Sequence, residues 1–535
     1  MKSGDADTAG LMTRVGAEGQ VLIRVRDTMA MSLAIIHSRA LDGLSAAAVE
    51  VEVHLANGLP SFTLVGLADL EVKESRERVR AALQSSGLEF PANKRITVNL
   101  SPADLPKEGA RFDLPIALGL LAASGQIDVE LLAQLECAGE LGLSGELRPV
   151  KGALAMALAL RATRLDRELI LPRGCADEAA LVQGLVVREA AHLLDLVNAL
   201  QPGSDAPLPR VQRDPPPPAD TPLDLRDIKG QAGPKRALEI AAAGGLSVLL
   251  VGPPGTGKSM LAQRLPTLLP PLSESEALES AALLSANGQF RPSLWAQRAF
   301  RSPHHSASAA ALIGGGSPPR PGEITLAQHG VLFLDELPEF QRLSLEALRE
   351  PLETGRVHIS RSAHQADFPA RFQLVAAMNP CPCGHLGNPT KACRCTPDQV
   401  TRYQNRLSGP LLDRIDLTVE VPVLPAAVLS AAPDGEPSAT VAARVAAARQ
   451  RAEARQGCVN GRLAAGQLDE YLRMTLEAEA MLHRASARLA WSGRSFHRVL
   501  RIARTIADLA ADDLVTPTHV AEAIQWRRAL PGRDE

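Results

Sequence analysis

Three short apolar runs in the middle of the chain determine the fold that we expect there. They occupy residues 246–251, 330–334 and 373–377, and stretches with helical spacing separate them along the sequence. Strands that are apolar on both sides are typical of a parallel sheet covered by helices on both faces. The pattern therefore predicts a central α/β domain.

The N-terminal part follows a different pattern. Residues 49–54 and 95–100 alternate around β-branched side chains, as strands with one buried face do. Residues 71–86 have a helical period with charges on one face, whereas residues 114–124 are apolar enough for a buried helix. We expect a separate α+β domain here.

Two interruptions divide the chain. Residues 201–222 hold eight prolines, including Pro215–Pro218, and this composition favours an extended linker. A weaker break at 424–438 precedes a region with helical patterns and little strand signal. The expected parts are a flexible extension over 1–30, the α+β domain over 31–200, the linker over 201–222, the α/β domain over 223–425 and a helical domain over 439–530.

Composition narrows the classes of function. The chain has 535 residues, of which 45% are hydrophobic and 22% charged, as in globular proteins. Its formal net charge is −3, so a nucleic-acid site has to be a local patch. Aromatic residues amount to 3%, which argues against gripping single strands mainly by base stacking. No apolar run reaches the ~18 residues of a membrane span and no secretory signal is apparent, so we expect a cytoplasmic protein.

A phosphate-binding sequence follows the first central strand. Its residues are Gly252, Pro253, Pro254, Gly255, Thr256, Gly257, Lys258 and Ser259. Between a strand and a helix, such glycines let backbone N–H groups converge on phosphates. We expect Lys258 to neutralise the β- and γ-phosphates of ATP and the Ser259 hydroxyl to bind Mg²⁺. A glycine-rich turn without a ligand is the alternative.

Polar residues follow the other two central strands. Asp335 and Glu336 end the second strand, where Asp335 can hold Mg²⁺ and Glu336 can polarise the attacking water. Asn379 follows the third strand, and its amide can position that water against the γ-phosphate, the role called sensor 1. A solvated strand end is the alternative for the carboxylates taken alone. Together with the phosphate loop, these residues predict an ATPase.

Four cysteines lie within one 15-residue window, 381–395. They form two Cys-x-Cys pairs, Cys381 with Cys383 and Cys393 with Cys395. Four thiolates can form a complete tetrahedral site, so we expect a structural Zn²⁺ that holds this insertion in one conformation. The alternative is two pairs of free thiols in a loop. A catalytic zinc is disfavoured because four sulfurs leave no open coordination position.

Longer stretches of sequence indicate a family. Residues 300–306, 320–324, 333–340, 379–384 and 408–416, together with the ATPase residues, resemble the AAA+ ATPases and among them the ComM/YifB magnesium-chelatase-like family. The resemblance extends from about residue 31 to residue 530. It implies a homo-oligomeric ring, expected to be a hexamer, with ATP bound between subunits and a C-terminal helical lid.

The resemblance also assigns roles to two arginines. Arg414 falls where related helicases place an arginine finger that reaches the γ-phosphate of the neighbouring subunit. Arg494 falls at the sensor 2 position, where a lid helix begins. The alternatives are a salt bridge from Arg414 to Asp413 or Asp416 and an ordinary surface position for Arg494.

A β-hairpin is predicted between the second and third central strands. Residues 355–361 alternate, and residues 367–371 return toward the next strand. In related ring helicases this hairpin projects into the pore, so Arg356 and Arg361 are expected to bind DNA phosphates independently of base sequence. The pair His304–His305 is expected in a second pore-region loop rather than in a metal site.

Two stretches of the N-terminal domain, 106–109 and 139–149, resemble the Lon-type protease domain. In that family a serine and a lysine form the catalytic dyad. Here the serine position holds Arg111 and the lysine position Leu154, with Lys151 offset by three residues. Acyl transfer then lacks an activated nucleophile, so we expect the fold without proteolysis.

These expectations describe an ATP-driven ring motor acting on branched or single-stranded DNA. The family resemblance implies branch migration of recombination intermediates during natural transformation. The first alternative is the ATPase subunit of a magnesium-chelatase-type metal-insertion or protein-remodelling complex, and the Lon-like domain and cysteine insertion count against it. The second alternative is a non-enzymatic scaffold, with which Lys258, Asp335, Glu336 and Asn379 conflict.

Overall fold

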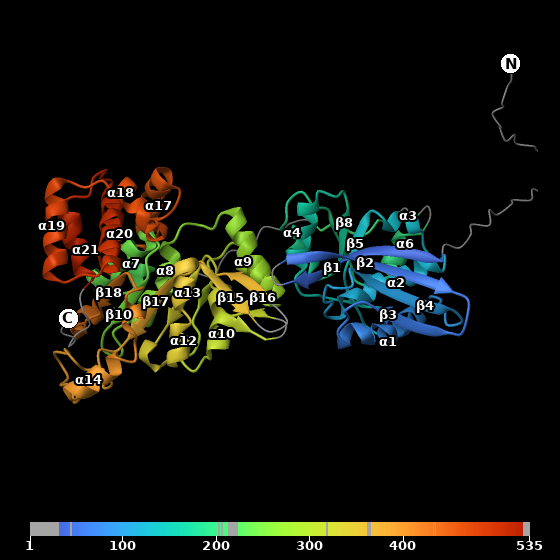
Figure 1. The fold of residues 1–535 in the computed structure, drawn as a ribbon, viewed down its shortest axis with the longest axis horizontal. Helices are drawn as coiled ribbons and strands as arrows, with labels where there is room; N and C mark the ends of the chain where they lie inside the picture. The colour runs from blue at the N-terminus through green and yellow to red at the C-terminus, as the bar shows by residue number, and fades with distance from the viewer. Residues whose placement is uncertain are drawn as a thin grey trace, which may run out of the picture.

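The computed structural model describes residues 32–527 except 43–44, 202–203, 205–206, 212–222, 317–318, 361–364, 432 and 434. The expected extension over 1–30, most of the linker and Arg361 lie outside the described residues. Figure 1 shows an elongated molecule, with the N-terminal domain at one end and the C-terminal helices at the other. None of the helices formed by the described residues combines the length and apolar character that a membrane crossing requires.

The N-terminal domain is built on a mixed seven-stranded sheet in the order β3-β4-β2-β1-β5-β8-β9. Its strands are β1 Leu33–Asp42, β2 Ser45–Ala56, β3 Ser61–Val65, β4 Arg95–Ser101, β5 Leu135–Cys137, β8 Glu168–Pro172 and β9 Val187–Ala190. The main helices are α1 Leu70–Ser85, α2 Asp113–Ala123, α4 Ala153–Thr163 and α6 Leu193–Ala199. Every residue of α2 is buried, so the buried helix predicted from the apolar run is confirmed, as are β2, β4 and α1.

The central domain contains a five-stranded parallel sheet in the order β11-β14-β17-β10-β18. The strands are β10 Val248–Val251, β11 Phe300–Arg301, β14 Val331–Leu334, β17 Gln373–Met378 and β18 Leu417–Glu420. All residues of β10, β14 and β17 are buried, which confirms the three predicted strands and the α/β fold class. Helices α7 Ala232–Gly244 and α8 Lys258–Leu268 pack beside this sheet.

The register of the sheet brings three sequence positions to one edge. Val251 pairs with Met378, and Leu334 pairs with Ala376. Because the strands are parallel, the residues that follow β10, β14 and β17 leave the sheet on the same side. Those residues are the phosphate loop, the two carboxylates and Asn379.

The central domain contains two β-hairpins. The predicted one is confirmed as β15 Arg356–Ser360 paired antiparallel with β16 Gln365–Pro369. The second joins β12 Gly314–Gly315 to β13 Arg320–Pro321, and it follows the short helix α10 Ala309–Ile313.

The C-terminal domain is helical. It comprises α17 Ser438–Gln456, α18 Leu468–Tyr471, α19 Leu476–Arg488, α20 Gly493–Ala510 and α21 Pro517–Gln525. Its apolar side chains form one continuous core with α7, α8 and the adjoining strands. The lid therefore packs on α7 and α8, the helices that cover the sheet.

One helix joins the N-terminal and central domains. Helix α9, Glu274–Ala286, lies against α4 at the junction (Figure 1). A shared apolar cluster contains Leu154 and Met156 from one side and Ala281 and Trp295 from the other. The backbone N–H of Gly152 also donates to the carbonyl of Ser285 at 3.1 Å.

Candidate functional site

The phosphate loop has the backbone of an anion site. Gly257 has φ +90° just before α8 begins at Lys258, a conformation that side-chain-bearing residues rarely adopt. The loop therefore ends where the free N–H groups of a helix N-terminus attract phosphate. This geometry agrees with the predicted strand, loop and helix.

The ammonium group of Lys258 lies between the phosphate loop and Asn379. Its Nζ donates to the carbonyls of Gly252 at 2.7 Å and Pro253 at 2.9 Å and to Oδ1 of Asn379 at 3.2 Å. Burial lowers the pKa of Lys258, while the carboxylates of Asp335 and Glu336 oppose that shift. The structure thus brings the residues that follow three different strands around one ammonium group.

Ser259 and Asp335 are paired as a magnesium site requires. The Ser259 hydroxyl donates to Oδ2 of Asp335 at 2.7 Å. A hydroxyl and a carboxylate beside the phosphate lysine form a hard oxygen donor set that suits Mg²⁺ bound to a nucleotide. The donor chemistry therefore fits the expected metal.

Glu336 occupies an unusual backbone position. It has φ +52° and ψ +46°, in the left-handed region, which costs energy for a residue with a side chain. Its Oε2 lies 3.1 Å from Nδ1 of His305. The sequence pattern predicts a pore-region loop for His305 and does not indicate this contact.

Arg414 is almost enclosed within its own subunit. Its side chain is 6% exposed and lies 2.5 Å from Oε1 of Glu353, and it donates to the carbonyl of Pro410 at 2.7 Å. Asp416 instead accepts from Ser247 and lies 3.4 Å from Arg498. Among the described residues the alternative pairing with Asp413 or Asp416 is therefore wrong, because Glu353 takes that place.

Arg494 is the second residue of α20, at the predicted start of a lid helix. Its side chain is 59% exposed and lies 3.5 Å from the same Oε1 of Glu353. The structure thus brings the two candidate arginines to one carboxylate. The sequence offered no signal for Glu353, which lies on α13, Arg349–Thr354, far from both along the chain.

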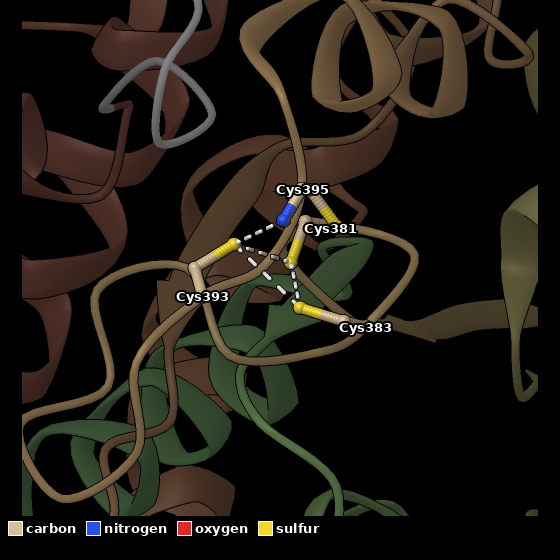
Figure 2. A group of neighbouring side chains, drawn as sticks. All are labelled: Cys381, Cys383, Cys393 and Cys395. Carbon is tan, nitrogen blue, oxygen red and sulfur yellow. Dashed lines mark hydrogen bonds between the residues drawn. The ribbon is translucent and has the colours of Figure 1, made fainter.

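The four cysteines converge as predicted (Figure 2). Their sulfurs all lie within 4.8 Å of one another. The separations among Cys381, Cys383 and Cys393 are 3.4, 3.6 and 3.7 Å, close to the ~3.8 Å edge of a tetrahedron with zinc–sulfur bonds of ~2.3 Å. The donor set therefore fits Zn²⁺ with four thiolates.

The environment of the sulfurs also differs from one to the next. The backbone N–H of Arg394 lowers the pKa of Cys383 to about 6, whereas burial raises the pKa of Cys381 to about 12. The insertion touches the phosphate loop, because a side chain at Gly384, where φ is +77°, would collide with the ring of Pro254. A metal that fixes the insertion would also fix one wall of the nucleotide site.

Arg356 is exposed at the base of the β15–β16 hairpin. The hairpin lies at the end of the central domain that faces the N-terminal domain (Figure 1). Arg361 lies outside the described residues, so its predicted contact with DNA remains a prediction.

Comparison with known proteins completes these observations. The family profile described as "Magnesium chelatase, subunit ChlI" matches residues 224–429, "Subunit ChlI of Mg-chelatase" matches 51–174, and "Magnesium chelatase, subunit ChlI C-terminal" matches 435–527. The chain is 50% identical over 503 residues to the uncharacterized protein YifB of Salmonella typhimurium, covering 93% of this chain and 97% of that protein. It is 49% identical over 506 residues to the competence protein ComM of Haemophilus influenzae, covering 93% and 98%.

The chain belongs to the ComM/YifB magnesium-chelatase-like family. It is also 28% identical over 216 residues to the magnesium-chelatase 38 kDa subunit of Rhodobacter capsulatus, but this match covers 36% of the chain and 54% of that subunit.

In this family member, the positions that resemble the Lon dyad carry neither nucleophile nor base. Arg111 is buried, and its Nη1 lies 4.0 Å from the sulfur of Met156. Burial lowers the pKa of Arg111 to about 10. Leu154 is fully buried in the cluster shared with α9, so the ATPase domain packs on the element where the lysine would be.

Proposed function

We propose that this protein is an ATP-dependent ring motor that remodels DNA and drives branch migration of recombination intermediates during natural transformation. The observation that carries the ATPase part is the convergence of Lys258, Ser259, Asp335, Glu336 and Asn379 at one edge of the parallel sheet.

Each residue of the site has its own role in ATP hydrolysis. ATP with Mg²⁺ supplies the phosphoryl group and its counter-charge, and Ser259 and Asp335 would hold that metal. Lys258 neutralises the phosphates, Asn379 orients the attacking water through its amide, and Glu336 accepts the proton from that water. Lys258 and Asn379 already face each other at 3.2 Å.

In a ring of subunits, arginines of one subunit complete the ATP site of its neighbour. In the proposed hexamer, Arg414 and Arg494 present their guanidinium groups to the nucleotide of the neighbouring subunit, where they stabilise charge in the transition state. Their shared partner Glu353 holds the two guanidinium groups together at one place in the subunit. Assembly then replaces Glu353 with phosphate as the acceptor.

DNA is the proposed substrate because the central domain carries two hairpins, and Arg356 stands exposed on one of them. Arginines on such a hairpin bind backbone phosphates without reading bases. The relative named competence protein ComM supports a role with DNA taken up by the cell. Within this proposal, Zn²⁺ at Cys381, Cys383, Cys393 and Cys395 has a structural role.

The second candidate is an ATPase subunit of a magnesium-chelatase-type complex. The similarity to the 38 kDa chelatase subunit favours it. We rank it second because that similarity covers 36% of the chain, whereas the similarity to ComM covers 93%.

The deciding experiment is ATP-dependent branch migration on a synthetic Holliday junction. We expect strand exchange by the wild type and none by Lys258→Ala or Glu336→Gln. A formed ring that hydrolyses ATP but leaves the junction unchanged would refute the DNA function. In that case, binding to a porphyrin-chelatase partner would be measured next.

A further inference from the structure

The edge at which the strands of the parallel sheet begin, opposite the ATP site, carries arginines that the proposed function does not use. Arg298 lies two residues before β11, and Arg371 lies two residues before β17. Strand β14 runs between these two strands, and the residue His329 just before it touches both arginines. Its carbonyl accepts from Nη1 of Arg298 at 2.6 Å, and its N–H donates to the carbonyl of Arg371 at 2.7 Å.

The C-terminal domain adds two more arginines to this amino edge of the sheet. Arg462 ends a short 3-10 turn that packs closely on the residues before β10, because a side chain at Gly461 would lie 2.7 Å from the carbonyl of Gly245. Arg449 lies on α17, and its Nε donates to the carbonyl of Ala242 near the end of α7 at 2.8 Å. Four separate stretches of the chain therefore contribute one arginine each, and we call the four residues the amino-edge arginines.

Little negative charge is available to balance this group. Within the part of the chain that the structure describes, none of the four arginines forms an ion pair. The carboxylates of Glu276 and Glu279 on α9 influence the group, but the ring of His329 already engages them at 3.4 and 2.6 Å. Exposed Glu453 lies one turn after Arg449 on α17 without pairing with it.

The amino-edge arginines are close enough to disturb one another. Burial lowers the pKa of Arg298, Arg449 and Arg462, that of Arg449 to about 10, and neighbouring guanidinium groups lower each of them further. All remain charged at neutral pH, so like charges are held together where water screens them poorly. Arrangements that cost free energy in this way are typical of functional sites.

A phosphate group has the charge and the shape that would relieve this repulsion. Guanidinium groups donate in a planar fork that matches phosphate oxygens, and several of them can bind one phosphate together. Two carbonyls, those of Pro270 and His329, hold Arg298 in place. The guanidinium groups of Arg371 and Arg462 are exposed and have no acceptor among the described residues, so they are available to a ligand from solvent.

We propose that the four amino-edge arginines form a second anion site, which binds a phosphate group at the edge of the sheet opposite the ATP site. Because the two sites lie at opposite ends of the same strands, both can be occupied at once. The phosphate belongs either to a nucleic-acid backbone or to a free phosphate compound. The site goes beyond the proposed function and does not depend on it.

The test measures the binding of inorganic phosphate to the full chain by isothermal titration calorimetry. Lys258→Ala is the starting protein, because it lacks the cation that attracts phosphate to the ATP site. Adding Arg371→Gln or Arg462→Gln should weaken the phosphate affinity about tenfold, the effect of losing one charge-assisted hydrogen bond. Both side chains are exposed, so the variants should keep the fold. Arg462→Lys keeps the charge without the fork and should weaken binding less than Arg462→Gln.

Arg484→Gln is the matched control, because it removes an exposed arginine of α19 that takes no part in this group. It should leave the phosphate affinity of Lys258→Ala unchanged. No measurable phosphate binding by Lys258→Ala, or equal affinity after the Arg371 and Arg462 substitutions, would overturn the second site.

A labelled single-stranded oligonucleotide then identifies the source of the phosphate. Its affinity is measured by fluorescence anisotropy with Lys258 intact. Weaker binding of the oligonucleotide to Arg371→Gln and Arg462→Gln than to the wild type would assign the site to a nucleic-acid backbone. Unchanged binding, together with weakened inorganic phosphate binding, would assign it to a free phosphate compound. Neither measurement uses branch migration, so failure of this site would leave the proposed function standing.

Discussion

Arg414 and Arg494 reach the same oxygen of Glu353, at 2.5 and 3.5 Å, although 80 residues of chain separate them. The family resemblance gives them different names, finger and sensor. Their shared partner places both guanidinium groups at one point of the subunit. If the finger serves the neighbour's nucleotide, we expect the sensor to serve that same nucleotide.

Mixing of inactive variants tests this expectation. Arg414→Ala and Arg494→Ala should each lower kcat about a thousandfold, the effect of removing an arginine finger. A mixture of Arg414→Ala with Lys258→Ala should regain ATPase activity, since some interfaces then combine an intact arginine with an intact phosphate loop.

A mixture of Arg414→Ala with Arg494→Ala distinguishes the two arrangements. If both arginines act on the neighbour, no subunit can donate the complete pair, and the mixture stays inactive. Recovery of activity in that mixture would show that Arg494 serves its own subunit, contrary to our expectation. ATP turnover measured across the mixing ratio gives the answer.

Lys258 and Glu336 should separate nucleotide binding from hydrolysis. Lys258→Ala removes the positive charge aimed at the phosphates, so binding of a fluorescent ATP analogue should weaken strongly. Glu336→Gln keeps the shape of the site but removes the base, so binding should persist while kcat falls by about 10²- to 10⁴-fold. Glu339→Gln is the control, because this exposed carboxylate pairs with Arg406 away from the site. Equal losses in all three variants would contradict the assigned roles.

Zinc removal should disturb the nucleotide site as well as the insertion. A strong chelator or Cys393→Ser should release one zinc per chain and lower the melting temperature by about 5 °C, since binding energy at such sites is folding energy. ATP affinity should fall too, because Gly384 of the insertion packs on Pro254. Cys458→Ser, outside the cluster, should change neither quantity. Elemental analysis that finds no zinc in the purified wild type would refute the metal site.

The contact between α9 and the N-terminal domain should matter for stability. Ala281→Asp places a charge in the apolar cluster that joins the two domains, so it should lower the free energy of unfolding by about 3 kcal/mol. Ser275→Asp adds the same charge at an exposed position of the same helix and should be nearly neutral. Similar denaturant midpoints for the two variants would show that the packing contributes little.

Much of the ATPase domain was predictable from sequence because its signals are local. The strands β10, β14 and β17 are uninterrupted apolar runs, and the phosphate loop, Asp335 and Asn379 directly follow them. Parallel pairing then brings their ends together without further information. The cysteine cluster and the β15–β16 hairpin were predictable for the same reason, because their sequence signals are also local.

The parts that were missed depend on long-range pairing. Strand β11 is only Phe300–Arg301, too short to produce a periodic pattern, so the contact between His305 and Glu336 was hidden. Glu353 is an ordinary helix carboxylate in sequence, and only tertiary structure shows that two arginines share it. Likewise, the helical pattern of α9 does not reveal that one face packs on another domain.

Helix α9 presents different faces to different parts of the molecule. Ala277 and Ala281 join the apolar cluster with α4, while Glu279 binds His329 at 2.6 Å, two residues before strand β14, which Asp335 directly follows. The two domains are therefore held together by side-chain packing through α9 as well as by the connecting chain. A fragment cut between the two domains would lose one side of this apolar cluster, so neither part would keep the packing that it has in the full chain.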